Sequence, residues 1–196
     1  MKKVLIENIL KKKGISPIIC LTAYSKPVAQ IIDKYCDIIL VGDSLGMVLY
    51  GMKSTKNVKF QTMIEHAKAV KKATKRSLVV FDMPYKTYTN KFIAYKNAKK
   101  AIELTNCDAV KLEGGVKIIN IIKFLTKNGI PVMGHIGLLP QHHLNFKYKG
   151  KSELEKKKIY QDALALTQAG VFSIVMECVV ESLAKKITQS ISVPTI

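Results

Sequence analysis

Five short apolar runs, each ending in an ionisable residue, constrain most strongly how this chain can fold. Each run has the length of a β-strand and is rich in valine and isoleucine, which favour strands. The runs are residues 38–43 (IILVGD), 77–82 (SLVVFD), 108–113 (DAVKLE), 130–135 (IPVMGH) and 172–177 (FSIVME). Residues 16–24 and 192–196 fit the same strand type. The sequence therefore predicts about seven strands whose interiors are apolar.

Segments with helical spacing of their apolar residues lie between these runs. Apolar side chains recur every three or four residues in segments 60–70, 94–102, 118–125, 160–167 and 183–187. Apolar strands that alternate with amphipathic helices predict a parallel sheet covered by helices. No linker, low-complexity tract or composition shift divides the chain, so we expect a single α/β domain over residues 1–196.

Two architectures have this order of elements, the (β/α)8 TIM-type barrel and the doubly wound open sheet. A barrel gathers functional groups from many strand ends at one mouth, whereas an open sheet concentrates them at a switch point and often carries a glycine-rich phosphate loop. A single strand-end aspartate could simply cap the next helix, but His and Glu are poor caps. With five ionisable strand ends and no GxGxxG motif or P-loop in the chain, the barrel is favoured.

In a barrel, the carboxylates of Asp43, Asp82 and Glu113 would share one cleft. Neighbouring carboxylates repel unless protons or a cation intervene, and Mg²⁺ suits oxygen ligands, so we expect a magnesium site. No CxxC or HExxH motif supports zinc. Lys111 lies two residues before Glu113 and so points the same way on a strand. It could bind a substrate oxygen, act as a Schiff-base nucleophile, or pair with Glu113.

Two further strand ends offer proton-transfer chemistry. Glu177 closes an apolar run and is a candidate general base. His135, in the segment MGHIG, could hydrogen-bond a substrate or simply occupy a core position. His142 and His143 lie in a predicted loop and show no metal-ligand spacing.

The formal net charge of +18 raises nucleic acid as a partner, but the lysines are scattered and no recognition motif accompanies them. We therefore expect no nucleic acid. No apolar run approaches the length of a membrane span, and the four cysteines form no CxxC pair. The N-terminal segment reads as an amphipathic helix without a cleavage site. These features predict a cytoplasmic protein with free thiols and no membrane association.

Several segments together resemble the ketopantoate hydroxymethyltransferase family. They are LTAY (21–24), ILVGDSLGMVLYG (39–51), DMP (82–84), DAVKLEGG (108–115), GIPVMGHIGLLPQ (129–141) and ME (176–177), in order along nearly the whole chain. The resemblance implies a (β/α)8 barrel, usually a homodecamer. It also implies Mg²⁺-dependent transfer of a hydroxymethyl group from 5,10-methylenetetrahydrofolate to 3-methyl-2-oxobutanoate (α-ketoisovalerate). The product is 2-dehydropantoate (ketopantoate), used in pantothenate and coenzyme A biosynthesis.

The resemblance also implies roles for individual residues. Asp43 and Asp82 match metal ligands, and Glu113 matches the third carboxylate of the metal site. The residues implied to bind the ketoacid are Asp43, Ser44, Asp82 and Lys111. Glu177 matches the proton acceptor.

The chain departs from the family pattern at its C-terminal end, in the loop at 142–150, and at Ser25, where the family commonly has aspartate. Because it stops at residue 196, we expect a seventh strand that is cut short, and an eighth strand and C-terminal helices that are missing, from either a fragment or a truncated gene product. The loop at 142–150 lacks the family's paired glycines. The alternatives are another Mg²⁺-dependent ketoacid lyase or aldolase on a similar barrel, or an inactive remnant.

Overall fold

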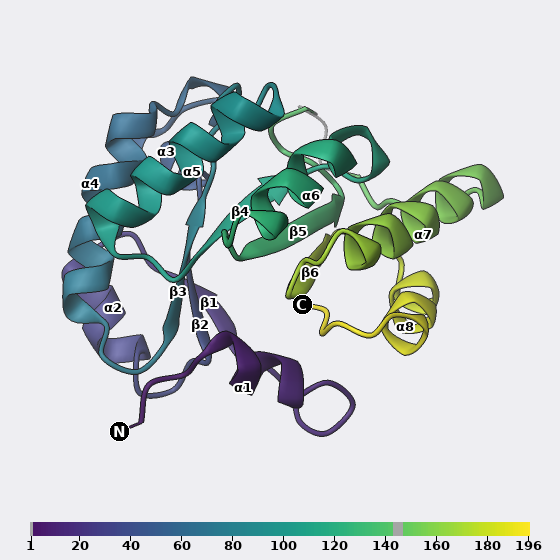
Figure 1. Cartoon of the computed structure of the whole chain (residues 1–196), viewed down its shortest axis with the longest axis horizontal. Helices are drawn as coiled ribbons and strands as arrows, with labels where there is room; N and C mark the ends of the chain where they lie inside the picture. The colour runs from purple at the N-terminus through teal and green to yellow at the C-terminus, as the bar shows by residue number, and fades with distance from the viewer. Residues whose placement is uncertain (1, 143–146) are drawn as a thin grey trace.

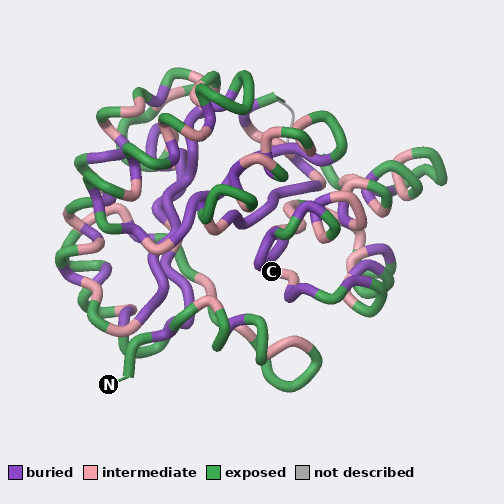
Figure 2. The backbone as a smooth tube through the Cα atoms, in the orientation of Figure 1, coloured by how far each residue is buried: buried purple, intermediate pink, exposed green. Residues whose placement is uncertain are grey.

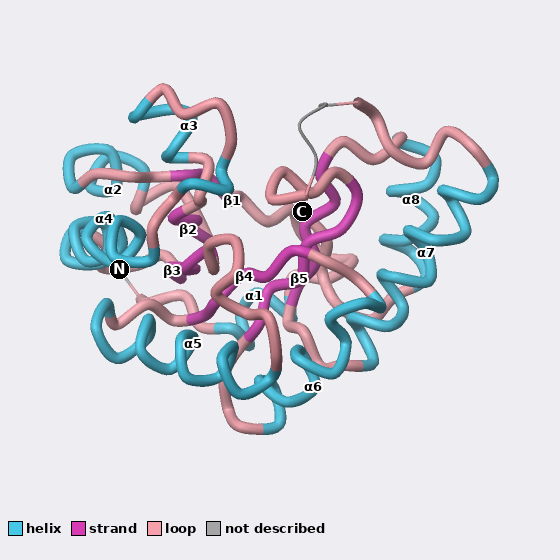
Figure 3. The backbone as a smooth tube through the Cα atoms, turned by 90° about the horizontal axis from the view of Figure 1, so that it is seen from above, coloured by secondary structure: helices cyan, strands magenta, loops and turns pink. Residues whose placement is uncertain are grey.

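The computed structural model describes residues 2–142 and 147–196, and its central feature is a six-stranded sheet in the order β1-β2-β3-β4-β5-β6. Every neighbouring pair of strands is parallel, as predicted. The strands are β1 (Cys20–Thr22), β2 (Ile38–Val41), β3 (Leu78–Asp82), β4 (Ala109–Glu113), β5 (Val132–Gly137) and β6 (Ser173–Glu177). They follow an arc rather than a flat layer, with helices around its outer side (Figures 1 and 3).

Six helices fall where the sequence predicts them, at the N-terminus and over segments 60–70, 94–102, 118–125, 160–167 and 183–187, whereas the helices at 26–32 and 45–50 were not predicted from apolar spacing. They are α1 (Ile6–Lys11), α2 (Lys26–Ile32), α3 (Leu45–Tyr50), α4 (Phe60–Ala73), α5 (Lys91–Thr105), α6 (Ile119–Lys127), α7 (Glu153–Gln168) and α8 (Glu181–Ser190), with 3₁₀ turns η1 (Thr55–Asn57) and η2 (Val116–Ile118). The side chain of Asn90 caps α5 by accepting hydrogen bonds from the next backbone N–H groups, a common start signal. In the described part of the chain, no helix is long and apolar enough to cross a membrane.

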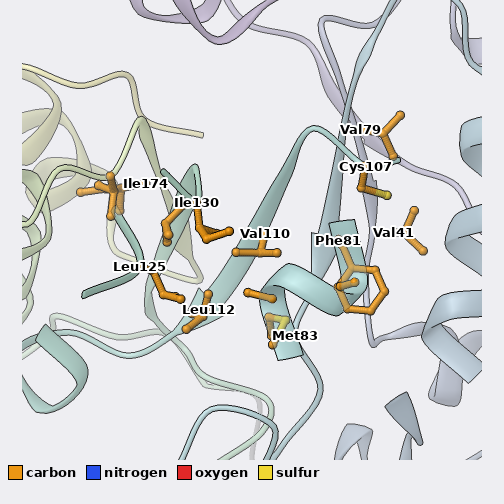
Figure 4. Packing of buried hydrophobic residues seen from close by; sticks show 14 of the residues in the cluster. Val41, Val79, Phe81, Met83, Cys107, Val110, Leu112, Leu125, Ile130 and Ile174 are labelled. Carbon is orange, nitrogen blue, oxygen red and sulfur yellow. The ribbon is translucent and has the colours of Figure 1, made fainter. Parts of the chain in front are cut away.

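The buried apolar residues form two clusters. Figure 2 shows that the strands are buried along most of their length. The larger cluster fills the space between the strands and the outer helices and includes Val79, Phe81 and Val110 (Figure 4). The smaller cluster lies inside the arc and includes Leu78, Val80 and the fully buried Ile9 of α1. Alternate residues of a strand thus belong to different clusters, and the predicted N-terminal amphipathic helix packs into the inner one.

The predicted seventh strand forms only a short pairing with β6. The backbone N–H of Ile174 donates to Pro194 (3.1 Å), and that of Ile196 donates to Ile174 (2.9 Å). A parallel bridge joins Ile174 to Thr195. At the opposite end of the arc, Leu21 of β1 is 45% exposed. The described chain is therefore an open barrel, as its length predicts.

Candidate active site

The predicted site residues lie at the carboxyl ends of neighbouring strands. Asp43 and Ser44 follow β2, Asp82 ends β3, and Glu177 ends β6. Lys111 and Glu113 belong to β4, and His135 belongs to β5. Parallel strands present these ends at one rim of a barrel, so a continuous series of contacts connects residues far apart in sequence.

The first contacts join Asp43, Asp82 and Lys111, all of them buried. The backbone N–H of Asp43 donates to Oδ2 of Asp82 at 3.1 Å. The same oxygen accepts a hydrogen bond of 2.6 Å from Nζ of Lys111. Lys111 therefore pairs primarily with Asp82, and its Nζ lies 4.0 Å from Oε1 of Glu113, the partner that sequence spacing suggests.

Lys111 is held in its charged form. Burial by itself would lower the pKa of its ammonium group, but the carboxylates of Asp82, Glu113 and Asp43 outweigh burial and raise it. A Schiff-base nucleophile must first lose its proton. The geometry therefore favours an electrostatic role for Lys111 over a covalent one.

His135 lies between two carboxylates rather than in an apolar setting. Its Nδ1 is 3.6 Å from Oε1 of Glu113, and its Nε2 is 3.2 Å from Oε2 of Glu177, in both cases without hydrogen-bond alignment. Burial and the charge of Lys111 lower the pKa of the ring, but the two glutamates outweigh them and raise it. The side chain of Glu177 is 35% exposed, which leaves it accessible from the rim.

Gln141, which the sequence reasoning did not single out, connects three strand ends. Its Nε2 donates to Oδ2 of Asp43 (2.8 Å) and to the backbone carbonyl of Met83 (2.9 Å), and its backbone N–H donates to Oε2 of Glu113 (3.1 Å). Its Oε1 accepts from the hydroxyl of Tyr88. The one signal that could have found Gln141 was its place at the end of the segment GIPVMGHIGLLPQ, which contains the predicted strand that ends in His135.

Ser44 has an unexpected partner. Its Oγ lies 2.8 Å from the hydroxyl of Tyr24, within hydrogen-bond distance, although Ser44 starts α3 and makes no side-chain cap bond there. Tyr24 belongs to the segment LTAY but carries no predicted role. The two hydroxyls form a polar pair next to Asp43.

The acidic cluster carries more negative charge than Lys111 balances. Burial first, and then the charge of Asp82, raise the pKa of Asp43 to about 8, although Lys111 and Gln141 act in the opposite direction. Burial also raises the pKa of Asp82. For Glu113, burial opposes ionisation, but His135 and Lys111 outweigh burial and lower its pKa. A bound cation would offset this negative charge and favour the ionised form of both aspartates.

The residues present fit a magnesium ion held by few protein ligands. Oδ1 of Asp82 and Oε1 of Glu113 are buried and have no hydrogen-bond partner among the described residues. Mg²⁺ commonly takes one or two carboxylates and fills its other positions with water and substrate. Within residues 2–142 and 147–196, no three His, Cys, Asp or Glu side chains are gathered closely enough to hold a metal together. The predicted direct ligation by Asp43, Asp82 and Glu113 together stays a prediction.

His142, which follows Gln141, borders this site. His142 is exposed, and its Nδ1 lies 4.0 Å from Oε2 of Glu113. His143 and the next three residues lie outside the described residues. The four cysteines, Cys20, Cys36, Cys107 and Cys178, are all free, as predicted. Cys36 and Cys107 are buried, whereas Cys20 is only partly buried and Cys178 is exposed.

Comparison with known proteins identifies the relatives of this chain. The family model described as ketopantoate hydroxymethyltransferase matches residues 3–196. A 3-methyl-2-oxobutanoate hydroxymethyltransferase of Pelagibacter ubique (strain HTCC1062) is 59% identical over 195 residues, covering 100% of this chain and 75% of that protein. The enzyme of the same name from Anaplasma marginale (strain Florida) is 50% identical, covering 97% of this chain and 70% of that protein.

Solved structures support the fold. A phosphonopyruvate hydrolase in complex with oxalate and Mg²⁺ matches with a TM-score of 0.72 at 12% identity, covering 97% of this chain and 71% of that one. A 2,3-dimethylmalate lyase of the PEP mutase/isocitrate lyase superfamily matches with a TM-score of 0.67 at 14% identity, covering 95% and 68%. At these identities the likeness concerns the fold alone. Together with the arc of six parallel strands, it confirms the predicted incomplete barrel.

Proposed function

Since the chain belongs to the ketopantoate hydroxymethyltransferase family, a family of transferase enzymes, we propose that it moves a hydroxymethyl group from 5,10-methylenetetrahydrofolate to 3-methyl-2-oxobutanoate. The product is 2-dehydropantoate, an intermediate of pantothenate biosynthesis. One observation carries the proposal for this chain: the buried Lys111 lies 2.6 Å from Asp82 and 4.0 Å from Glu113, and the partly exposed carboxylate of Glu177 ends a nearby strand.

The proposed metal is Mg²⁺, held by Asp43 and Asp82, with Glu113 as the third carboxylate of the metal site. When bound, Mg²⁺ polarises the keto group of the substrate and so acidifies the neighbouring C–H. Asp43, Ser44, Asp82 and Lys111 bind the ketoacid in this proposal.

Glu177 is the proposed general base, which removes the proton at C3 of the ketoacid. Its side chain is 35% exposed, whereas Asp43, Asp82 and Glu113 are buried. Nε2 of His135, 3.2 Å from Oε2 of Glu177, restricts where this carboxylate can lie. His135 in turn is a proposed substrate contact, since its ring lies between Glu113 and Glu177. The electron pair released at C3 places negative charge on the keto oxygen, and the fixed positive charge of Lys111 stabilises that charge. C3 forms a new C–C bond to the one-carbon unit of the folate, and both C–N bonds of the methylene bridge break. Water supplies the hydroxyl oxygen of the product, and the proton from C3 together with one proton of that water goes to the two folate nitrogens, which leaves tetrahydrofolate.

We also propose that the protein is cytoplasmic and assembles as a homo-oligomer. The family resemblance implies a decamer. The exposed apolar side chains of α3 support an interface: Val48, Leu49 and Tyr50 are each at least half exposed. The proposed partners are small molecules, the ketoacid and folate.

Exchange of the C3 proton tests the chemistry without folate. Wild-type protein with Mg²⁺ and α-ketoisovalerate in D₂O should exchange this proton, as followed by NMR, and Glu177→Gln should abolish the exchange. Glu181→Gln, an exposed glutamate on α8, is the matched control and should exchange normally. Undiminished exchange in Glu177→Gln would remove Glu177 from the base role. Cleavage of a C–C bond in a 2-oxo acid without folate would instead favour a lyase or aldolase, and no turnover at all would favour an inactive remnant.

A further inference from the structure

A chain of hydrogen bonds runs from α4 to the rim of the barrel and is not used by the chemistry above. His66 of α4 lies between two tyrosines: its Nε2 is 2.8 Å from the hydroxyl of Tyr50, and its Nδ1 is 2.6 Å from the backbone carbonyl oxygen of Tyr24. The hydroxyl of Tyr24 lies 2.8 Å from Oγ of Ser44. We call Tyr24, Tyr50 and His66 the histidine clamp. Through it, α4 is connected to the residue next to Asp43.

The surroundings of His66 fix which ring nitrogen carries the proton. A carbonyl oxygen only accepts hydrogen bonds, so Nδ1, which faces the carbonyl of Tyr24, carries the hydrogen. In the neutral ring Nε2 is then an acceptor and takes its hydrogen bond from the hydroxyl of Tyr50. The rings of Tyr50 and His66 also meet edge to face, with centroids 5.9 Å apart and planes at 78°. Both hydrogen bonds of His66 therefore have a defined direction.

The helix that carries His66 gives the histidine clamp a fixed base. The side chains of α4 that face the core, Met63, Ala67 and Val70, are fully buried in the larger apolar cluster. His66 lies beside this buried face and is itself partly buried. A helix anchored in a close-packed core keeps its place relative to the sheet, so His66 is a fixed reference for the segment after β1 and for α3.

The two arms of the histidine clamp end on the two segments that carry the Tyr24–Ser44 pair. Ser44 directly precedes α3, and Tyr50 is the last residue of that helix. Tyr24 follows β1, and His66 holds the backbone of Tyr24 rather than its side chain. The histidine clamp therefore sets the distance between the segment after β1 and α3, and with it the position of both hydroxyl groups.

The Tyr24–Ser44 pair has one hydroxyl hydrogen to spare. Two hydroxyl groups carry two hydrogens, and the hydrogen bond between them uses one. Whichever hydroxyl donates within the pair, the other keeps its own hydrogen for a further acceptor. Asp43, the neighbour of Ser44, is buried, and its carboxylate already accepts from Gln141. The remaining hydrogen suits a carboxylate oxygen of a small acid at the rim, with which it makes a charge-assisted bond.

We propose that His66 is a positioning residue for the ketoacid: through Tyr24 and Tyr50 it holds the hydroxyl pair that donates a hydrogen bond to the carboxylate of the substrate. This inference deepens the proposed function and rests on it, because Ser44 belongs to the proposed ketoacid site. A contact made equally in the ground state and in the transition state changes KM and leaves kcat unaltered. Loss of the histidine clamp therefore weakens ketoacid binding without slowing the exchange of the C3 proton at saturation.

The exchange assay with Mg²⁺ and α-ketoisovalerate in D₂O, run over a range of ketoacid concentrations, separates these two quantities. His66→Leu should raise KM about tenfold, as for a lost hydrogen bond to a charged group, and keep kcat within about twofold of wild type. His66→Asn should restore KM to within about threefold of wild type, because its amide N–H can replace Nδ1–H on the carbonyl of Tyr24. Tyr50→Phe removes one hydroxyl from a half-exposed side chain and should raise KM about threefold. Thr62→Val, one turn away on α4, is the matched control and should behave as wild type.

A wild-type KM in His66→Leu, an equal rise in Thr62→Val, or a fall in kcat without a rise in KM would each overturn the positioning role. Thermal unfolding of each variant is measured alongside; should His66→Leu not fold, a wild-type KM in Tyr50→Phe overturns the role instead.

The tautomer is tested without substrate, by ¹H–¹⁵N NMR of the histidine rings. A proton on Nδ1 of His66 is the expected result, and a proton on Nε2 alone would overturn the histidine clamp. Wild-type protein that binds α-ketoisovalerate in titration calorimetry but does not exchange its C3 proton would refute the proposed base chemistry. The positioning role would then be read from the dissociation constant, which His66→Leu should raise by the same factor of about ten.

Discussion

Replacing Gln141 by leucine is the perturbation with the most direct structural prediction. The leucine side chain has similar size but removes the amide, which makes three buried hydrogen bonds. These bonds are to Oδ2 of Asp43 (2.8 Å), to the carbonyl of Met83 (2.9 Å) and from the hydroxyl of Tyr88. Gln141 is 0% exposed, so water does not replace the amide without a rearrangement.

The magnitude depends on pH because Asp43 changes charge. A neutral buried hydrogen bond contributes about 1 kcal/mol, and one to a charged group about 2 kcal/mol. Burial, followed by the charge of Asp82, raises the pKa of Asp43 to about 8. At pH 6 all three bonds involve neutral groups, so we expect a loss of about 3 kcal/mol in the free energy of unfolding. At pH 9 Asp43 is ionised, and the expected loss rises to about 4 kcal/mol.

The assay is urea unfolding of metal-free protein, in the presence of EDTA, at both pH values. Tyr88→Phe is the control, since it removes one of the three bonds and should cost about 1 kcal/mol at either pH. A cost below about 1 kcal/mol for Gln141→Leu at both pH values would refute the reasoning, because those three bonds would then contribute nothing net. A cost that falls from pH 6 to pH 9 would refute the assigned charge of Asp43.

Four further predictions concern the charged groups. The pKa of Asp43 is raised on folding, so the metal-free folded state binds more protons than the unfolded state between about pH 4 and pH 8. The stability of the metal-free protein therefore falls as pH rises through this range. Asp43→Asn should flatten that fall in urea titrations. Lys111→Met should cost about 3–5 kcal/mol by urea unfolding, because it leaves Asp82 buried without its cation, and a loss below about 1 kcal/mol would contradict the pairing. Borohydride with α-ketoisovalerate should attach no mass to wild-type protein, since Lys111 is held protonated, and a modified Lys111 peptide in mass spectrometry would restore the Schiff-base alternative. Added Mg²⁺ should raise the unfolding midpoint more at pH 8.5 than at pH 6, because ionised Asp43 is the better ligand; equal shifts would argue against Asp43 as a ligand.

The strands were predictable because their signal is local. Residues 77–82 and 108–113 carry apolar runs of strand length, and β3 and β4 occupy them within one residue. The placement of Asp82 and Glu113 at a common rim follows from the parallel order, since each strand of such a sheet presents its carboxyl end on the same side. Period-two alternation likewise places Lys111 and Glu113 on the same face of β4.

Only the tertiary structure decided which of these groups touch and what charge they hold. Lys111 bonds to Asp82 on the neighbouring strand rather than to Glu113, because the register pairs Asp82 with Lys111 directly. Gln141 reaches Asp43 across 98 positions of sequence, a contact that no local pattern encodes. The raised pKa of Asp43 arises from burial, which depends on every element packed around the site. Periodicity is a property of neighbouring residues, whereas desolvation and long-range hydrogen bonds exist only once the chain has folded around them.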